Sequence, residues 1–452
     1  MVVVTTSQPS AASLGTTSQR SAASLGTADN ITGQLDRRRR AVADAWNLGD
    51  EVVLIGAGER VPVPGRGDRM YPFRSHSEYL YLTDRERPGG VLAFDPRDGW
   101  VDFVTAVTRE ERLWEGATDA QEGRPTLELD GWLGERRGRP LACLGAPVAA
   151  VAGDDSLATE LRYALNHVRR QKDEFELRRM RVAERATAAG FAAIEPLLRP
   201  GRTERAVQIE LEAEFFRNGA DILAFDTIVG GGPNAAVLHF PPGQRPFQTG
   251  DLILIDAGGE YRGYASDITR TYAASGTFTP EQSELYAIVR SAGLAATARC
   301  TSGTEWRDVH RTAALVIAQG LVDFGLLRGE PESLVERGAQ SLFLPHGIGH
   351  MVGLGIRDAG EVLKGRRERK DEFPKLRMDL PLLAGHVVTV EPGIYLVPAL
   401  LHDAEFRERY RDAVDWDRAE SMLDFGGIRI EDNVLVTDDG PKVLTGDVPI
   451  HK

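Results

Sequence analysis

The sequence predicts a chain of the α+β class, in which a larger unit of antiparallel strands with outer helices follows a smaller α/β unit. Three observations predict this class. Short apolar runs between turn residues dominate residues 51–107, long capped helical patterns occupy much of residues 173–324, and residues 385–437 return to apolar strand patterns. At 452 residues, the chain has room for two domains.

The first thirty residues have a composition of their own. The heptapeptide SAASLGT occurs at Ser10–Thr16 and again at Ser21–Thr27. Because Ser, Ala, Thr and Gly side chains bury little apolar surface, residues 1–30 are expected to form a flexible, low-complexity tail.

The expected amino-terminal α/β unit spans residues 31–172. The strings EVVLIGAG, GGVLAFDP and WVDFVTAV, which begin at Glu51, Gly89 and Trp100, are typical of short buried strands. The string ELRYALNHVRR has the period of a helix. The basic run Arg37–Arg40 is interpreted as a solvated helix end.

The second expected unit, residues 173–452, opens with a helix that ends before Pro200. Thr203 has the position of an N-cap for the next helix. A cap of the Thr-x-x-Gln type at Thr279 starts another helix, which is expected to run through Ile288. The later strings GHVVTVEPGIYLV and GGIRIEDNVLVT have the apolar alternation of strands, and each carries a glutamate.

A strand that ends in a carboxylate lies within the stretch DLILIDAGGEYRGYASDITRTY. Asp256 follows four apolar residues, and an ionised carboxylate in an apolar setting costs several kcal/mol unless a cation or hydrogen-bond donors compensate it. If the chain turns about Tyr261 and Arg262, Asp256 faces Asp267 across a hairpin. Two facing carboxylates can hold a pair of metal ions. A solvated hairpin with surface aspartates is the alternative.

Further candidate ligands lie in three glycine- or strand-associated motifs. PHGIGHMVGLG supplies His346 and His350, TVEPGIY supplies Glu391, and GIRIEDN supplies Glu431 with Arg429 on the same strand face. Together with the two aspartates, one histidine and two glutamates make an oxygen-rich set with a single imidazole. Such a set suits a pair of Mn²⁺, Co²⁺ or Zn²⁺ ions.

These motifs resemble those of a known family. LIDAG, SDITRT, PHGIGH, TVEPGIY and GIRIEDN resemble, in order and spacing, the pita-bread metallopeptidases, which include methionine aminopeptidase, aminopeptidase P and prolidase. Upstream, YPFRSHSEYLYLT and LWEGATDAQEG resemble the amino-terminal domain of aminopeptidase P. The resemblance implies a curved antiparallel sheet with outer helices, preceded by a smaller α/β domain.

The resemblance also implies roles for named residues. In that family, two divalent metals, usually Mn²⁺, are bound by the residues that match Asp256, Asp267, His350, Glu391 and Glu431. It implies that a metal-activated hydroxide attacks the scissile carbonyl and that Glu391 passes its proton to the leaving nitrogen. His239 and His346 are then expected to contact the substrate and stabilise the oxyanion. Arg429 is expected to buttress the glutamates.

Two arginines are candidate substrate contacts. Members that cut before proline usually carry a histidine before an aspartate, whereas Arg357 stands before Asp358 in GLGIRDAG. A guanidinium there can bind a substrate carboxylate or pair with Asp358 or Glu361. Arg377, in FPKLRMDL, matches the arginine with which prolidases clamp the free carboxylate of a dipeptide, and a surface loop arginine is the alternative.

Three functions are compatible with these motifs. The sequence favours a prolidase, an Xaa-Pro dipeptidase, because of Arg377 and the long polar connection Leu401–Leu423 before Glu431, which could close the carboxyl side of the site. The first alternative is aminopeptidase P, which releases the residue before proline from longer peptides and which the amino-terminal motifs favour. The second is a binding module that keeps the fold without catalysis.

Composition restricts the partners. A net charge of −13 argues against a nucleic-acid surface, and no apolar run approaches the length of a membrane span. Cys143 and Cys300 are far apart and lack metal-type spacing, which is typical of a reducing compartment. We therefore expect a cytoplasmic protein. The resemblance implies that it acts on short proline-containing peptides. The resemblance implies a homodimer or homotetramer.

Overall fold

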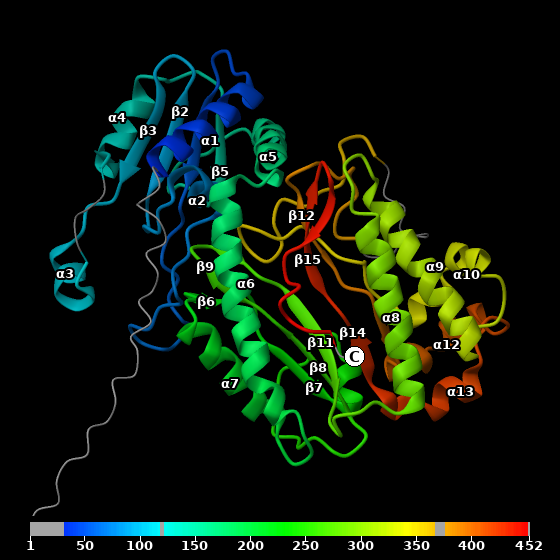
Figure 1. Cartoon of the computed structure of the whole chain (residues 1–452). Coiled ribbons are helices and arrows are strands. Elements are labelled where there is room, and N and C mark those ends of the chain that lie inside the picture. Colours follow the sequence, from blue (N-terminus) through cyan, green and yellow to red (C-terminus); the bar gives the residue numbers. More distant parts are fainter. Residues whose placement is uncertain (1–30, 118–121, 367–375, 451–452) are drawn as a thin grey trace, which may run out of the picture.

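The computed structural model of the chain describes residues 31–117, 122–366 and 376–450 (Figure 1). The expected tail lies outside the described residues, as do parts of the motifs LWEGATDAQEG and FPKLRMDL. Helices and strands are mixed throughout, in agreement with the expected α+β class. None of the helices in the described ranges combines the length and apolarity that a membrane crossing requires.

The amino-terminal part of the chain forms a five-stranded mixed sheet with helices around it (Figure 1). Its strands are β1 (Val52–Gly56), β2 (Val91–Asp95), β3 (Gly99–Val104), β4 (Arg124–Pro125) and β5 (Leu141–Gly145). Its helices are α1 (Ile31–Trp46), α2 (Ser77–Thr83), α3 (Arg109–Glu115), α4 (Leu129–Gly134) and α5 (Asp155–Arg170). The strand order is β4-β3-β2-β1-β5, and the apolar runs predicted to be strands are β1, β2 and β3.

The larger part of the chain begins with α6, which starts at a capping box between Asp173 and Glu176. Its helices are α6 (Glu174–Ile194), α7 (Glu204–Arg217), α8 (Pro280–Ala298), α9 (Trp306–Phe324), α10 (Pro331–Arg337), α11 (Pro398–Leu401), α12 (Ala404–Arg409) and α13 (Trp416–Ser421). Its strands are β6 (Ile222–Leu223), β7 (Ile228–Gly231), β8 (Leu252–Ala257), β9 (Gly259–Tyr261), β10 (Tyr264–Ala265), β11 (Ile268–Ala273), β12 (Val387–Val390), β13 (Gly393–Tyr395), β14 (Gly427–Arg429), β15 (Asp432–Thr437) and β16 (Gly440–Val443).

One helix is longer than the sequence predicted. The capping box at Thr279 is present, but α8 continues past Ile288 to Ala298. Ala292 and Ala296 are fully buried, and the intervening Gly293 lies against Pro392. Tertiary packing therefore extends a segment whose small residues give only a weak helical period.

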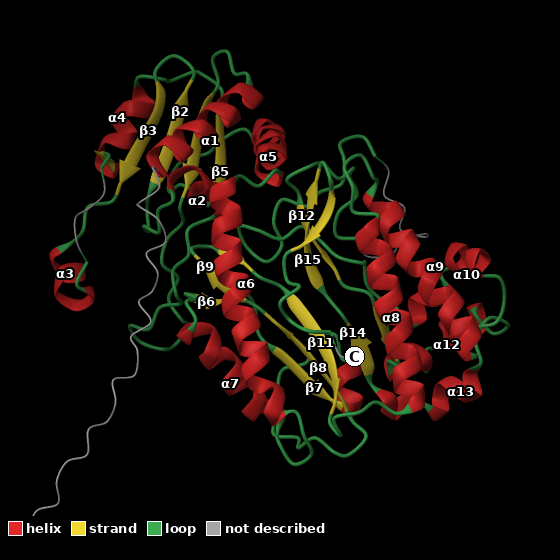
Figure 2. Cartoon of the chain, viewed as in Figure 1, coloured by secondary structure: helices red, strands yellow, loops and turns green. Residues whose placement is uncertain are grey.

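The strands of the larger unit lie between two helical layers (Figure 2). Helices α6 and α7 cover β7, β8 and β11 through a core that includes Phe191, Leu211 and Phe215. Helices α8 and α9 pack on the other side, around Trp306 and Ile317. The strands of the larger unit thus lie between α6 and α7 on one side and α8 and α9 on the other.

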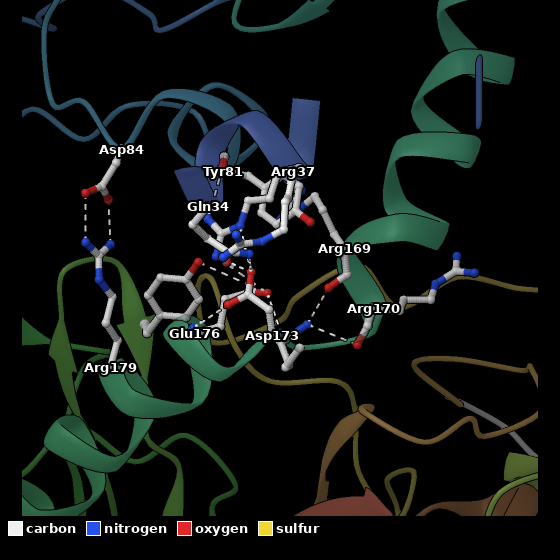
Figure 3. Close-up of polar contacts among 12 residues, drawn as sticks. Gln34, Arg37, Tyr81, Asp84, Arg169, Arg170, Asp173, Glu176 and Arg179 are labelled. Carbon is white, nitrogen blue, oxygen red and sulfur yellow. Dashed lines mark hydrogen bonds and ion pairs between the residues drawn. The ribbon is translucent and has the colours of Figure 1, made fainter. Parts of the chain in front are cut away.

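The two units share a core and a polar network. Val42 and Trp46 of α1 belong to the same apolar cluster as Met180 of α6 and Tyr264 of β10. Beside this cluster, Gln34 and other side chains of α1 contact Asp173 at the start of α6, and Arg179 of α6 pairs with Asp84 (Figure 3). These contacts fix the amino-terminal unit on the helix that leads into the larger unit.

Arg38 corrects the interpretation of the basic run Arg37–Arg40 as a solvated helix end. Its side chain is only 3% exposed. The guanidinium donates to Asp173 Oδ2 at 2.9 Å and to the Tyr81 carbonyl oxygen at 3.1 Å, and it lies 3.7 Å from Glu176 Oε2. A count of like charges could not identify Arg38, because its partners lie far away in the sequence.

Arg38→Met should lower the free energy of unfolding by about 3–5 kcal/mol, because it leaves the buried carboxylate of Glu176 without its cation. Chemical denaturation followed by circular dichroism measures the change. The neighbouring Arg37, which is exposed, offers a matched control: Arg37→Met should change stability by no more than about 0.5 kcal/mol. Equal effects of the two substitutions would contradict a structural role for the Arg38 network.

Candidate metal centre

Asp256 lies on β8 and Asp267 lies just before the adjacent strand β11, but the two aspartates do not face each other. Asp256 of β8 pairs with Thr269 of β11, so Asp267 lies two residues before the partner of Asp256. The expected register is wrong because the tip of the hairpin is Arg262-Gly263, whose φ angles of 53° and 85° suit a two-residue turn. A shift of two residues keeps both side chains on one face of the sheet. The two carboxylates therefore lie on the same face, as predicted, although the predicted register is wrong.

Two polar residues attach β15 and its flank to the end of β11. Glu431 forms an isolated antiparallel bridge with Thr269, and the Thr269 hydroxyl donates to Glu431 Oε2 at 2.7 Å. Asn433 accepts from the Asp267 backbone N–H at 3.1 Å and donates to the Asp267 carbonyl oxygen at 2.9 Å. These bonds set Asp267 and Glu431 side by side.

His350 lies in a tight loop against the edge of β12. Its Nδ1 is 3.0 Å from the Met351 carbonyl oxygen, which only accepts, so Nδ1 carries the proton and Nε2 presents a lone pair. Nε2 lies 3.5 Å from Asp267 Oδ2 and 3.9 Å from Glu391 Oε1. The preceding Gly349 has φ +156°, and a Cβ there would lie 2.0 Å from the Thr389 carbonyl oxygen. Only glycine allows this approach.

A cavity of about 480 Å³ gathers these groups. The five predicted metal ligands all line it: Asp256, Asp267, His350, Glu391 and Glu431. Donor atoms of Asp267, His350 and Glu431 lie within 4.8 Å of one another. The rest of the wall includes the predicted substrate residues His239 and Arg357, together with Phe225, Asp226, Thr227, Ile228, Phe240, Pro241 and Ile356.

Burial and mutual repulsion shift the ionisation of this cluster. Burial, reinforced by the neighbouring carboxylates, raises the pKa of Asp267 and of Glu431 well above its usual range. Burial raises the pKa of Glu391 to about 7, although the field of Arg429 opposes the shift. Burial lowers the pKa of His350 to about 4, so its imidazole is neutral at physiological pH.

The cluster requires cations that the protein itself does not supply. Arg429 is the buried countercharge: its Nη2 donates to Asp256 Oδ2 at 2.6 Å and its Nε donates to Thr269 Oγ1 at 3.1 Å. One guanidinium cannot balance four carboxylates, and Asp256 Oδ1 is buried without a hydrogen-bond partner among the described residues. Acceptors of His350 and Asp267 also face each other. These residues therefore fit divalent metals with oxygen and imidazole ligands.

The structure distinguishes the two candidate substrate histidines. His346 is largely buried, and both of its ring nitrogens have partners: Nδ1 lies 2.9 Å from the Gly347 carbonyl oxygen, and Nε2 lies 2.9 Å from the Tyr395 hydroxyl. The same hydroxyl accepts from Arg429 Nη1 at 2.8 Å. His239 is exposed, lines the cavity, and has no hydrogen bond to another described residue. His346 thus belongs to the support of the cluster, and His239 faces the open space.

The predicted substrate arginines lie in different positions. Arg357 is exposed and lines the cavity, whereas Arg377 is exposed but is not among the cavity residues. The long connection expected to close the site folds into α11, α12 and α13 instead. It packs against α10, where Tyr410 donates to the Arg337 carbonyl oxygen, and none of its residues lines the cavity.

Several supporting residues were not predicted from the sequence. Thr269, Tyr395 and Asn433 lie within the quoted motifs, but neither periodicity nor spacing assigns them a role. Their function is to orient other side chains, which depends on contacts between distant strands. The signal that could have identified these three residues is their position inside the quoted motifs.

A buried, oxygen-rich metal site within an antiparallel α+β frame defines a metal-dependent hydrolase. Residues 178–438 match the model of metallopeptidase family M24, and residues 35–127 match that of the aminopeptidase P N-terminal domain. The chain belongs to metallopeptidase family M24, the group of pita-bread peptidases that its motifs resemble.

Relatives match over most of the chain. A probable Xaa-Pro aminopeptidase of Botryotinia fuckeliana is 31% identical over 87% of this chain and 89% of its own length. An Xaa-Pro aminopeptidase of Haemophilus influenzae is 35% identical over 84% of this chain and 87% of its own length. Among solved structures, aminopeptidase P from E. coli with the inhibitor Pro-Leu has a TM-score of 0.76 at 28% identity, and the match covers 92% of this chain and 95% of that one.

Metal binding should raise the stability of the native state. With Mn²⁺ at about 100 times its Kd, the native state should gain about 2.7 kcal/mol relative to the chelated protein. Asp267→Asn should remove most of this gain, yet it should make the chelated protein more stable than wild type, because it relieves repulsion among buried carboxylates. Thermal unfolding with EDTA and with Mn²⁺ measures both effects.

Asp226→Asn is the matched control for this test. Asp226 is an exposed carboxylate on the wall of the same cavity but lies outside the cluster of close donor atoms. This variant should keep the metal-dependent rise in melting temperature. An undiminished rise in Asp267→Asn would exclude Asp267 as a metal ligand.

Proposed function

We propose that this chain is an Xaa-Pro aminopeptidase, which releases the first residue of a peptide whose second residue is proline. The observation that carries the proposal is the extent of the match. Aminopeptidase P structures and Xaa-Pro aminopeptidase relatives are similar to the chain across both of its units, and not in the catalytic part alone. The sequence favoured the dipeptidase, but these comparisons support its alternative better. A module without catalysis has no support, because all five candidate ligands line one cavity.

The metal ligands in this proposal are Asp256, Asp267, His350, Glu391 and Glu431, with Mn²⁺ as the ion. Two bound divalent ions would acidify a water and polarise the scissile carbonyl. The protein contributes the geometry: Arg429 and Thr269 hold the carboxylates of Asp256 and Glu431. Asn433 holds the backbone of Asp267, and the Met351 carbonyl holds the tautomer of His350.

Glu391 is the proposed proton carrier. It lies on the cavity wall, where it can take a proton from the attacking water and deliver it to the leaving proline nitrogen. Glu391 Oε2 also lies 3.6 Å from His346 Nδ1, which places the His346–Tyr395–Arg429 chain directly behind it.

His239 is the proposed donor to the developing oxyanion. Its ring has no partner among the described residues and it lies on the cavity wall beside the ligands. Donors aimed at developing charge commonly supply a large part of catalysis. His346 takes a positioning role instead, because its two nitrogens are engaged by Gly347 and Tyr395.

Other parts of the proposal concern the whole protein. We keep a tail over residues 1–30, an amino-terminal domain over residues 31–172 and a catalytic domain over residues 173–452; the family models that match residues 35–127 and 178–438 are compatible with this division. A cytoplasmic location and a homodimer or homotetramer also remain proposals.

Substrate length tests the proposed function. The purified protein with Mn²⁺ should cleave Ala-Pro-Ala faster than Ala-Pro, because an aminopeptidase leaves the carboxyl side of its site open to a longer chain. Release of alanine, measured by chromatography, gives both rates. Ala-Ala-Ala, which lacks proline, serves as the control and should be cleaved slowly. Faster cleavage of Ala-Pro would restore the dipeptidase interpretation.

His239→Ala should lower kcat for Ala-Pro-Ala by about 10²–10³-fold, because it removes a donor to the oxyanion. KM should change little, since the donor acts mainly in the transition state. His402→Ala, at an exposed histidine in the connection outside the cavity, should leave both constants unchanged. An unchanged kcat in His239→Ala would remove the proposed role.

A further inference from the structure

Arg357 is a cation on the cavity wall that the protein leaves without a partner. Its side chain is exposed, and within the described residues no hydrogen bond or ion pair engages it. It lines the same cavity as the candidate ligands His350 and Glu391. The guanidinium therefore lies on the side of the reacting groups.

The two nearby carboxylates are already paired with other cations. Asp358 lies 2.8 Å from Arg169 Nη2 and 2.8 Å from Lys172 Nζ, and its side chain is 1% exposed. Glu361 lies 2.9 Å from Arg170 Nη2. The sequence left open whether Arg357 would pair with Asp358 or Glu361. In the structure, both carboxylates are paired with cations at the end of α5 and just after it.

The same clamp holds the backbone around Arg357. The Asp358 N–H donates to the Met351 carbonyl oxygen at 3.1 Å, and this oxygen also accepts from His350. Lys172 Nζ donates in addition to the Arg169 carbonyl oxygen at 2.7 Å. A backbone hydrogen bond thus closes the loop between His350 and Asp358, and the ion pairs of Asp358 attach this loop to a buried ion cluster. Arg357 is held in place at the wall.

Charge then selects what can approach Arg357. Two divalent cations would balance the four carboxylates of the cluster, so the guanidinium would remain uncompensated. A neutral imidazole, which the family resemblance implies at this position, would attract no anion at neutral pH, whereas a guanidinium is always charged and binds carboxylates through two parallel hydrogen bonds. The ammonium group of a peptide is repelled by Arg357 and attracted by Asp226, on the same cavity wall.

We infer that Arg357 is a specificity residue that binds a carboxylate on the leaving side of the scissile bond, so that the enzyme prefers substrates with an acidic group on or directly after the proline. This inference rests on the proposed function. The carboxylate has two possible sources: the free terminus of an Xaa-Pro dipeptide and the acidic side chain of a third residue. Both offer the same planar group to the guanidinium.

Two isosteric substrate pairs distinguish the sources. Ala-Pro is compared with Ala-Pro-amide, and Ala-Pro-Glu-amide is compared with Ala-Pro-Gln-amide, each with Mn²⁺. In at least one pair the carboxylate should lower KM about tenfold or more, which is the scale of a charge-assisted hydrogen bond. The pair that shows the difference identifies the source of the carboxylate.

Substitutions at two arginines test the assignment. Arg357→Gln should abolish the difference within the pair and leave KM for the amide nearly unchanged, and Arg357→Lys should restore part of it. Arg377→Gln removes the same charge from an exposed residue that does not line the cavity, so the difference should persist. Melting temperatures confirm that the variants are folded.

Other outcomes would overturn the inference. A KM ratio below twofold within both pairs for the wild-type enzyme would do so. A KM ratio that is unchanged in Arg357→Gln would also overturn it, as would an equal decrease of this ratio in Arg377→Gln. If both amides are cleaved and KM does not differ within either substrate pair, the proposed function stands and this inference fails. If no peptide is cleaved, the proposed function fails, and calorimetric binding of Ala-Pro and Ala-Pro-amide to wild type and Arg357→Gln decides the inference alone.

Discussion

The concentration of four carboxylates in one cavity is the constraint on which the rest of the structure depends. Burial makes each ionised carboxylate costly, and proximity adds repulsion, which the raised pKa values of Asp267 and Glu431 express. The protein accommodates the cluster with one buried guanidinium, Arg429, and with hydrogen bonds from Thr269 and Asn433. The negative charge that these groups leave unbalanced requires divalent cations.

The strands make this arrangement possible because they supply backbone partners to the ligand positions. Glu431 is joined to Thr269 by a backbone bridge, and Asp267 is held by the side chain of Asn433. Behind these ligands, Arg429, Tyr395 and His346 form a hydrogen-bonded chain that reaches Glu391. The site is therefore rigid on its buried side. His239 and Arg357 lie on the exposed wall, where no hydrogen bond to another described residue engages their side chains.

The amino-terminal unit contributes to that wall indirectly. Arg169 and Lys172, in and just after α5, hold Asp358, and Asp358 is attached through Met351 to the loop of His350. A shared apolar core and the network around Arg38 and Asp173 fix the same junction (Figure 3). The buried charges at the junction of the two units thus also hold the loop that carries Arg357. This coupling gives a physical reason for the family resemblance to extend over both units.

Local sequence identified the five candidate metal ligands and predicted the main helices, their caps and the class of the fold. Caps and apolar periods act over a few residues, and the ligands lie in motifs that the resemblance identifies. Even the wrong register for Asp256 and Asp267 left both on one face, since a shift of two preserves alternation. Tertiary structure alone decided the rest: that Arg38 is buried, that Tyr395 engages His346, and that Arg169 and Lys172 leave Arg357 free. Each of these depends on contacts between residues far apart in the chain, whose pairing no local pattern records.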